Sequence, residues 1–186
     1  IYTTGYAQEF VLSEDERIAY MTDDRGGVKI IDISQIDNFK IISEFITDGL
    51  AQKIQISNDR SKLYVSVYKE GGYYYEDESY LNVIDISDKS NPSLVSNLDL
   101  NSSKLSAFRF NFDETKLFVS SGYPDYNDEI YEVLEDYEDV DLLSSSSKNW
   151  HTSSGELVLI ENETVMLAIS YYKIDFIDVS DPTNPI

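Results

Sequence analysis

The sequence contains no cysteine, which excludes disulfide bonds and thiolate metal sites. It has a single histidine and no H-E-x-x-H motif, so a histidine-based metal centre is excluded as well. Its apolar runs are all shorter than the roughly 18 residues that a membrane-spanning helix needs, so we expect no membrane insertion. Phosphate-binding glycine loops and the regular calcium-loop motif are also missing. The sequence motifs therefore identify no catalytic reaction.

Basic residues are scarce, because 14 Lys and Arg stand against 35 Asp and Glu and the net charge is −21. Phosphate backbones and anionic lipid surfaces repel such a chain, so we expect no nucleic-acid partner. The partners that such a charge favours are cations, basic proteins or neutral ligands. The alternative is that the acidic residues only keep the protein soluble. We predict no resident cofactor. Weak binding of Ca²⁺ by the acids clustered at 125–141 is the one exception that we keep open.

Aromatic residues, in contrast, are abundant. The chain has 15 Tyr and 8 Phe among 186 residues, and 41% of its residues are apolar, which is ordinary globular usage. Aromatic and β-branched side chains fit the pleated, half-buried surface of a sheet. The length suffices for one domain or for a section of a larger one. The composition thus favours a folded, sheet-rich protein.

Two short units recur along the chain, and recurrence at a regular period indicates a repeat architecture. One unit reads GVKIIDIS, LNVIDISD and KIDFIDVSD at 27–34, 81–88 and 173–181. The other unit is found at 10–22, 54–66, 108–120 and, more weakly, 159–170. With Ser13, Ser57, Asn111 and Glu161 taken as equivalent, the spacings are 44, 54 and 50 residues. Periods of ~40–50 residues with four short strands each are typical of propeller blades.

Each copy has the local pattern of paired strands. Apolar residues alternate at period 2, as in IQI and FRF, and a second apolar strand follows a Ser-x-Asp turn. Short polar side chains favour such a turn because they bond nearby backbone N–H groups. The I-D-I-S strand comes third, and a turn rich in Asp, Asn and Pro, as at 87–93, ends it. An outer strand, as at 40–45 or 93–98, completes the copy.

The stretch 5–34, GYAQEFVLSEDERIAYMTDDRGGVKIIDIS, resembles the LVIVD repeat, a propeller-forming repeat of bacterial and archaeal proteins, many of them at the cell surface. The matching features are a Gly-Tyr-Ala start (5–7), an Ala-Tyr-Met second strand (19–21), a Gly-Gly pair (26–27) and the D-V-S-D-P exit from Asp178. The likeness is strong in the first two copies, clear in the last and weak in the later half of the third. It implies a propeller and an extracellular or cell-surface setting, and it carries no catalytic residues.

We therefore expect an all-β fold, a β-propeller of about four four-stranded blades. The blade ranges are about 5–47, 50–99, 104–148 and 152–186, and the last blade is truncated. The first residues read as the tail of an outer strand, and the chain stops where the last outer strand should begin. We interpret the chain as a section of a larger propeller and as part of a longer protein. A closed ring of four blades is the alternative.

Residues 121–150 allow two interpretations. In repeat register, 130–136 is the third strand, with Glu135 in the place of Asp85, and 140–147 is the outer strand. The alternative is a helix whose apolar face would be formed by Ile130, Val133, Leu134 and Tyr137. We favour strands, because a blade that lacks two strands would leave its neighbour uncovered.

The two long loops, 68–79 and 122–128, both link a second strand to a third, so strand alternation predicts that they share one face at the mouth of the central channel. Tyrosine offers contact area and a hydroxyl at low entropic cost, which suits a binding surface. The predicted site consists of Tyr73, Tyr74, Tyr75, Glu76, Asp77, Tyr80, Tyr123, Asp125, Tyr126 and Asp128. The alternative is that the tyrosines pack on one another and only order the loops.

Three functions are compatible with this pattern. We favour a non-enzymatic propeller module of an exported or cell-surface protein that binds a protein or glycan partner through the Tyr-rich acidic face. A hydrolase or lyase with a carboxylate-based site in the channel is the alternative, and a purely architectural domain is the third. The repeated Asp32, Asp85 and Asp178 are interpreted as turn residues, because a residue present once per blade more often meets a need that each blade has.

Overall fold

The structure is a computed structural model that describes residues 2–71, 77–102, 104–122, 127–146, 156–169 and 173–186. In these ranges the chain forms fifteen β-strands and one turn of 3-10 helix, η1 (Glu135–Tyr137). The predicted all-β class is therefore confirmed. Within the same ranges, none of the helical structure is long and apolar enough to cross a membrane.

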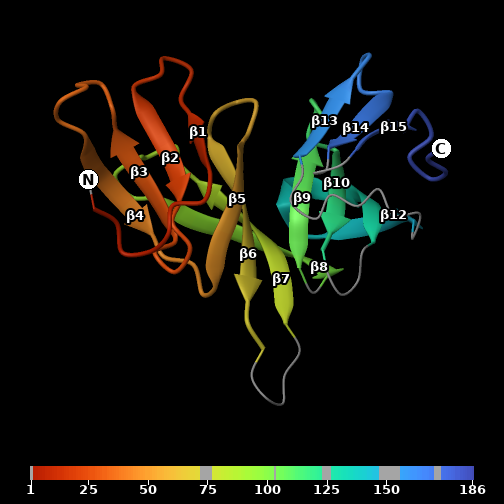
Figure 1. The fold of residues 1–186 in the computed structure, drawn as a ribbon, viewed down its shortest axis with the longest axis horizontal. Coiled ribbons are helices and arrows are strands. Elements are labelled where there is room, and N and C mark those ends of the chain that lie inside the picture. The colour runs from red at the N-terminus through yellow and green to blue at the C-terminus, as the bar shows by residue number, and fades with distance from the viewer. Residues whose placement is uncertain (1, 72–76, 103, 123–126, 147–155, 170–172) are drawn as a thin grey trace. The chain divides into compact units, whose positions relative to one another are not determined.

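The chain divides into two compact units, unit 1 (residues 1–98) and unit 2 (residues 99–186). Unit 1 contains two four-stranded sheets, each with its strands in chain order (Figure 1). The first sheet consists of β1 (Phe10–Leu12), β2 (Ile18–Thr22), β3 (Val28–Asp32) and β4 (Lys40–Phe45). The second consists of β5 (Leu50–Ile56), β6 (Lys62–Lys69), β7 (Glu78–Asp85) and β8 (Ser93–Ser102). The unit boundary falls within β8, which also runs past the expected blade limit at residue 99.

The two sheets of unit 1 enclose one hydrophobic core. β1 and β2 both contact β5, so the first strands of the two sheets lie side by side. Alternate residues of β3 in the first sheet, Val28 and Ile30, pack against Leu63, Val65 and Ile84 of the second. All five side chains are almost fully buried. This packing explains why the apolar residues recur at period 2 in each copy.

Unit 2 repeats the arrangement with one four-stranded and one three-stranded sheet. The first consists of β9 (Leu105–Phe110), β10 (Lys116–Ser121), β11 (Asp128–Val133) and β12 (Val140–Ser146). The second consists of β13 (Glu156–Ile160), β14 (Val165–Ile169) and β15 (Ile174–Asp178). β13 contacts β9, and Phe118 and Ile130 pack against Leu157, Met166 and Ile177. Each unit is thus a pair of blade-like sheets that pack face to face.

The third copy forms strands, as we favoured, and not a helix. β11 pairs with β10 and β12, and η1 is a single turn between β11 and β12. The expected register is wrong, however. Lys62 pairs with Asp85 in the second sheet, and the equivalent Lys116 pairs with Glu132, so Glu132 and not Glu135 takes the place of Asp85. The amino-acid sequence of 130–136 resembles the repeat, but the backbone pairing places the residue equivalent to Asp85 three positions earlier than that resemblance suggests.

The fourth copy also needs a correction of one residue. Leu12 pairs with Ala19 at the first hairpin, and Leu159 pairs with Met166 at the corresponding hairpin of the last sheet. Ile160, rather than Glu161, is therefore equivalent to Ser13. The hairpin keeps its length but loses the polar residue that the other copies place at this position.

Candidate functional site

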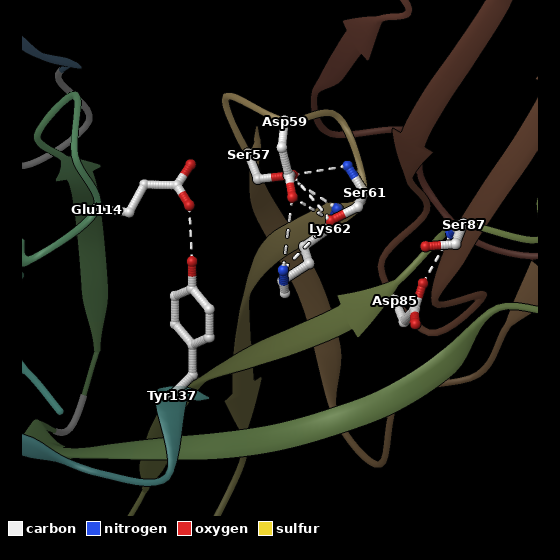
Figure 2. A network of polar contacts seen from close by, with 8 residues as sticks. All are labelled: Ser57, Asp59, Ser61, Lys62, Asp85, Ser87, Glu114 and Tyr137. Carbon is white, nitrogen blue, oxygen red and sulfur yellow. Dashed lines mark hydrogen bonds and ion pairs between the residues drawn. The ribbon is translucent and has the colours of Figure 1, made fainter. Parts of the chain in front are cut away.

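Asp59 closes the turn between β5 and β6 (Figure 2). Its Oδ1 accepts hydrogen bonds from the hydroxyl of Ser57 at 2.7 Å and from the backbone N–H of Ser61 at 2.9 Å. Ser57 Oγ in turn accepts the N–H of Lys62 at 2.9 Å, and Lys62 Nζ lies 3.8 Å from Asp59 Oδ2. Because these donors favour the charged carboxylate, Ser57 first among them, the pKa of Asp59 falls to about 2.

The same turn occurs in the β1–β2 and β9–β10 hairpins, so the predicted Ser-x-Asp turn is confirmed. Ser13 donates to Asp15 at 2.7 Å, and the side-chain amide of Asn111 donates to Asp113 at 2.6 Å. The pKa of Asp15 is lowered chiefly by Ser13, and the pKa of Asp113 is lowered chiefly by Thr115. These carboxylates are hydrogen-bonded by their own turns.

The residue after each of these aspartates has a left-handed backbone. The φ angles of Glu16, Arg60 and Glu114 are 54°, 61° and 60°. Glycine is the residue that takes such angles without steric cost, yet none of the three turns uses it. Each turn therefore carries a side chain that projects from a strained position.

Asp85 begins the turn after β7 (Figure 2). It accepts the backbone N–H of Ser87 at 2.7 Å, and this bond is the main cause of its lowered pKa. Asp32 and Asp178 accept the N–H two residues on in the same way, each at 2.9 Å. The interpretation of these three aspartates as turn residues is confirmed.

Tyr137 links η1 to the β9–β10 turn in unit 2 (Figure 2). Its hydroxyl donates to Glu114 Oε2 at 2.6 Å, and its ring meets the ring of Phe110 edge-on with centroids 6.4 Å apart. Tyr137 also has a positive φ of 60°. The sequence placed it only on a hypothetical helix face, so this contact was not predicted.

A buried charge cluster lies in the first sheet. Lys29 is fully buried, and its Nζ donates to Gly26 O and to Glu44 Oε2, both at 2.8 Å. Asp23 Oδ2 lies 3.9 Å from Lys29 Nζ and accepts the N–H of Gly5 at 3.0 Å. Asp23 Oδ1 is buried without a hydrogen-bond partner in the described part of the chain. The cluster holds the β2–β3 loop and the segment before β1 together.

Three of the ten predicted site residues are described. Asp77 is exposed and accepts the hydroxyl of Tyr68 at 2.6 Å and the N–H of Gly71 at 2.8 Å. The hydrogen bond to Asp77 is also the main cause that raises the pKa of Tyr68 to about 12. Tyr80 and Asp128 belong to strands β7 and β11 rather than to loops. Tyr80 packs against the core of unit 1, and Asp128 is only 2% exposed.

The other seven predicted residues lie outside the described residues. They are Tyr73, Tyr74, Tyr75, Glu76, Tyr123, Asp125 and Tyr126. The shared loop face therefore stays a prediction. Among the described residues, no group of three or more His, Asp or Glu side chains is placed to hold a metal ion. Weak Ca²⁺ binding at 125–141 stays a prediction too.

The sheet order, the hairpin turns and the repeat spacing can now be compared with known proteins. The LVIVD-repeat profile matches residues 4–43 and 64–99. The chain carries LVIVD repeats. This repeat forms β-propeller structures, so the predicted resemblance is confirmed. No curated protein matches the sequence.

Solved structures show the same fold at low sequence identity. A candidate 6-phosphogluconolactonase from Bacteroides uniformis is 12% identical with a TM-score of 0.73, and the match covers 95% of the LVIVD-repeat chain and 51% of that protein. The β-propeller domain of Cps50 (Swd1) from Myceliophteria thermophila is 13% identical with a TM-score of 0.68, over 94% of this chain and 54% of that domain.

A chain of the mitotic checkpoint complex is 12% identical with a TM-score of 0.65, over 94% of this chain and 51% of that one. Identities this low show the fold alone, and that fold is the β-propeller. The LVIVD-repeat chain spans about half the length of these propellers.

Proposed function

We propose that the LVIVD-repeat chain is a non-enzymatic binding module of an exported or cell-surface protein. Its partner is another protein with a basic surface, and the loop between β6 and β7 binds it. The observation that carries the proposal is the way in which Asp77 closes the base of this loop. The net charge of −21 supports a basic partner, because electrostatic attraction steers association and selects partners.

The base of the β6–β7 loop is built as a support. Asp77 accepts hydrogen bonds from Tyr68 on β6 and from the backbone of Gly71, so it ties the two ends of the loop. β6 and β7 pair as far as Lys69 and Glu78, beyond the end of the corresponding strands of the first sheet. An Arg25–Glu70 ion pair at 3.4 Å joins the neighbouring loop to the same base. Rigid supports of this kind reduce the entropic cost of binding through a loop.

The experiment is a capture of envelope proteins of the source organism, followed by a calorimetric titration of the purified partner. Replacing Tyr73, Tyr74 and Tyr75 together by Ser is expected to weaken binding by at least about tenfold, because tyrosines are frequent hot spots. The matched control replaces Tyr2 and Tyr6 by Ser, since both are highly exposed outside the loop. Equal affinity of the triple variant and the control would refute the proposal. Capture of a glycan alone would show that the partner is a glycan and not a protein.

The hydrolase or lyase alternative has less support. A general acid near neutral pH requires a carboxyl group of raised pKa. Among the described residues, the carboxyl groups whose pKa departs clearly from its ordinary value are all lowered by hydrogen bonds. They are Asp15, Asp32, Asp59, Asp85, Asp88, Asp113, Asp178 and Asp181. The likeness to a candidate lactonase extends to the fold alone.

The last sheet supports the view that this module is part of a larger propeller. One face of β13–β15 packs on the other sheet of unit 2, whereas the opposite face carries paired apolar residues that this unit does not bury. Leu167 pairs there with Phe176, which is 71% exposed, and Ile169 pairs with Ile174, which is 56% exposed. In the first sheet, the equivalent face packs on the following sheet. We infer that a further blade covers this face.

The absence of cysteine makes this inference simple to test. A thiol introduced by Phe176→Cys in the full-length protein is expected to resist maleimide labelling, whereas Ile36→Cys, at a position 84% exposed, is expected to react. Equal labelling rates at the two positions would show that no blade covers the face.

A further inference from the structure

Unit 1 contains a cavity of about 400 Å³ at the end of its two sheets where the β1–β2 and β5–β6 turns lie. It is lined by Ser13, Glu14, Asp15, Ile18, Tyr20, Ile56, Arg60 and Lys89. We propose that this cavity binds a small organic carboxylate with an apolar body. The volume falls within the range of roughly 300–1,000 Å³ that is usual for small-ligand sites.

The apolar part of the cavity comes from the contact between the two sheets. Tyr20 is 1% exposed and belongs to the core, and Ile18 and Ile56 pack at the edge of that core. Because these three side chains come from facing strands, the floor keeps its shape only while the sheets are packed together. An apolar floor favours a ligand with a hydrocarbon or aromatic body over a bare inorganic anion.

The cations at the rim supply the anion-binding part. Arg60 and Lys89 have no carboxylate within ion-pair distance in the part of the chain that the structure describes. Other cations of the same unit, such as Lys53, Lys62 and Lys69, pair with acids, as expected in a chain with 35 of them. Two cations that line one cavity and have no carboxylate partner among the described residues match the chemistry of a carboxylate ligand, which arginine can bind through two parallel hydrogen bonds.

Both cations extend from backbone that is fixed. The N–H of Arg60 donates to Ser57 O at 3.0 Å, and its left-handed φ of 61° is set by the turn. Lys89 O accepts the hydroxyl of Ser43 on β4 at 2.5 Å, which ties the β7–β8 loop to the first sheet. A positive φ outside glycine is costly and tends to persist where it positions a functional side chain.

The two acids of the lining are not equivalent partners for these cations. Asp15 accepts the hydroxyl of Ser13 at 2.7 Å and the N–H of Arg17 at 3.2 Å, so its charge is engaged by its own turn. Glu14 is an exposed residue of the lining. Its charge selects against ligands with several negative groups, so a monocarboxylate fits better than a dianion.

The test is a ¹H–¹⁵N NMR titration of the protein with phenylacetate, phenylacetamide and inorganic phosphate. Phenylacetate is expected to shift the amide signals of 13–18 and 57–62 with a Kd of about 1 mM or lower, and the other two probes to bind at least about tenfold more weakly. Shifts of equal size with phenylacetamide, or no shifts up to about 10 mM phenylacetate, would overturn the proposal.

Charge-removing variants decide the roles of the two cations. Arg60→Gln and Lys89→Gln are each expected to weaken phenylacetate binding by about tenfold. Arg109→Gln is the matched control, since Arg109 is an exposed cation on β9 of unit 2 and does not line the cavity. Unchanged affinity of both cavity variants would also overturn the proposal. The variant in which Tyr73, Tyr74 and Tyr75 are replaced by Ser is expected to bind phenylacetate with unchanged affinity. The cavity site and the loop site are therefore tested independently of one another.

Discussion

The hydroxyl of Tyr137 donates a hydrogen bond of 2.6 Å to Glu114, and this bond joins the connection between β11 and β12 to the β9–β10 turn. Both residues have positive φ angles, so two strained turns support one another. The β11–β12 connection has six residues, 134–139, whereas the β3–β4 and β7–β8 connections have seven each. The bond anchors this connection directly before the outer strand β12, which pairs with β11.

Tyr137→Phe is expected to destabilise unit 2 by about 1 kcal/mol, because the variant loses one hydrogen bond to a charged acceptor and keeps the ring contact with Phe110. Urea unfolding followed by near-ultraviolet circular dichroism measures the change. Tyr6→Phe is the control, since Tyr6 is 78% exposed. Identical midpoints for wild type and Tyr137→Phe would show that the bond contributes nothing to stability.

The Asp59 turn is expected to make stability depend on pH. The pKa of Asp59 is about 2 in the folded state and 3.8 in its ordinary state, so the folded protein binds a proton there less readily than the unfolded chain. Its contribution to stability is therefore complete above about pH 5 and is lost as pH falls through about 2. The loss of overall charge repulsion on acidification acts in the opposite direction.

Comparison with a variant separates the two effects. Asp59→Asn is expected to lower the melting temperature by a few degrees at pH 6, and this difference is expected to shrink as pH approaches about 2. Asp37→Asn removes the same charge from an exposed loop and controls for net charge. A difference between wild type and Asp59→Asn that stays constant with pH would contradict the assignment.

The sequence predicted the features that depend on neighbours along the chain. Strand alternation and the Ser-x-Asp turns are local, because the donors of Asp59 lie within two residues of it. The register of the third strand failed, because it depends on pairing between Lys116 and Glu132 across the sheet and not on the resemblance of letters. A lysine between the apolar neighbours Val28 and Ile30 was the one available signal of the buried charge cluster.

The cavity and the Tyr137 contact could not be predicted, since both join residues that are far apart in the sequence. Arg60 and Tyr20 line one cavity only because two sheets pack face to face. Glu114 meets Tyr137 through a turn whose length the repeat pattern does not determine. Tyr80 looked like a loop residue, but pairing of β7 as far as Glu78 places it in a strand, against the core.

Glu16, the left-handed residue of the β1–β2 turn, is a position where glycine is expected to increase stability. Glu16→Gly is expected to raise the free energy of unfolding by about 0.5 kcal/mol, because the relief of the unfavourable φ of 54° exceeds the added flexibility of the unfolded chain. Glu14→Gly, in the same turn but without positive φ, is expected to lower it instead. Thermal unfolding of both variants checks the pair. A loss of stability in Glu16→Gly equal to that in Glu14→Gly would show that the backbone at residue 16 is not strained.

The buried Lys29 cluster gives the largest expected effect. Lys29→Met is expected to cost about 3 kcal/mol, because Asp23 would keep a buried carboxylate without a cation while the methionine still fills the space. Adding Asp23→Asn to Lys29→Met is expected to recover part of this loss, since no full charge then remains buried next to Gly26. Urea unfolding of the two single variants and the double variant forms a complete cycle. Strict additivity of the two single changes would show that Lys29 and Asp23 do not stabilise one another, and that the lysine depends only on Glu44 and the carbonyl of Gly26.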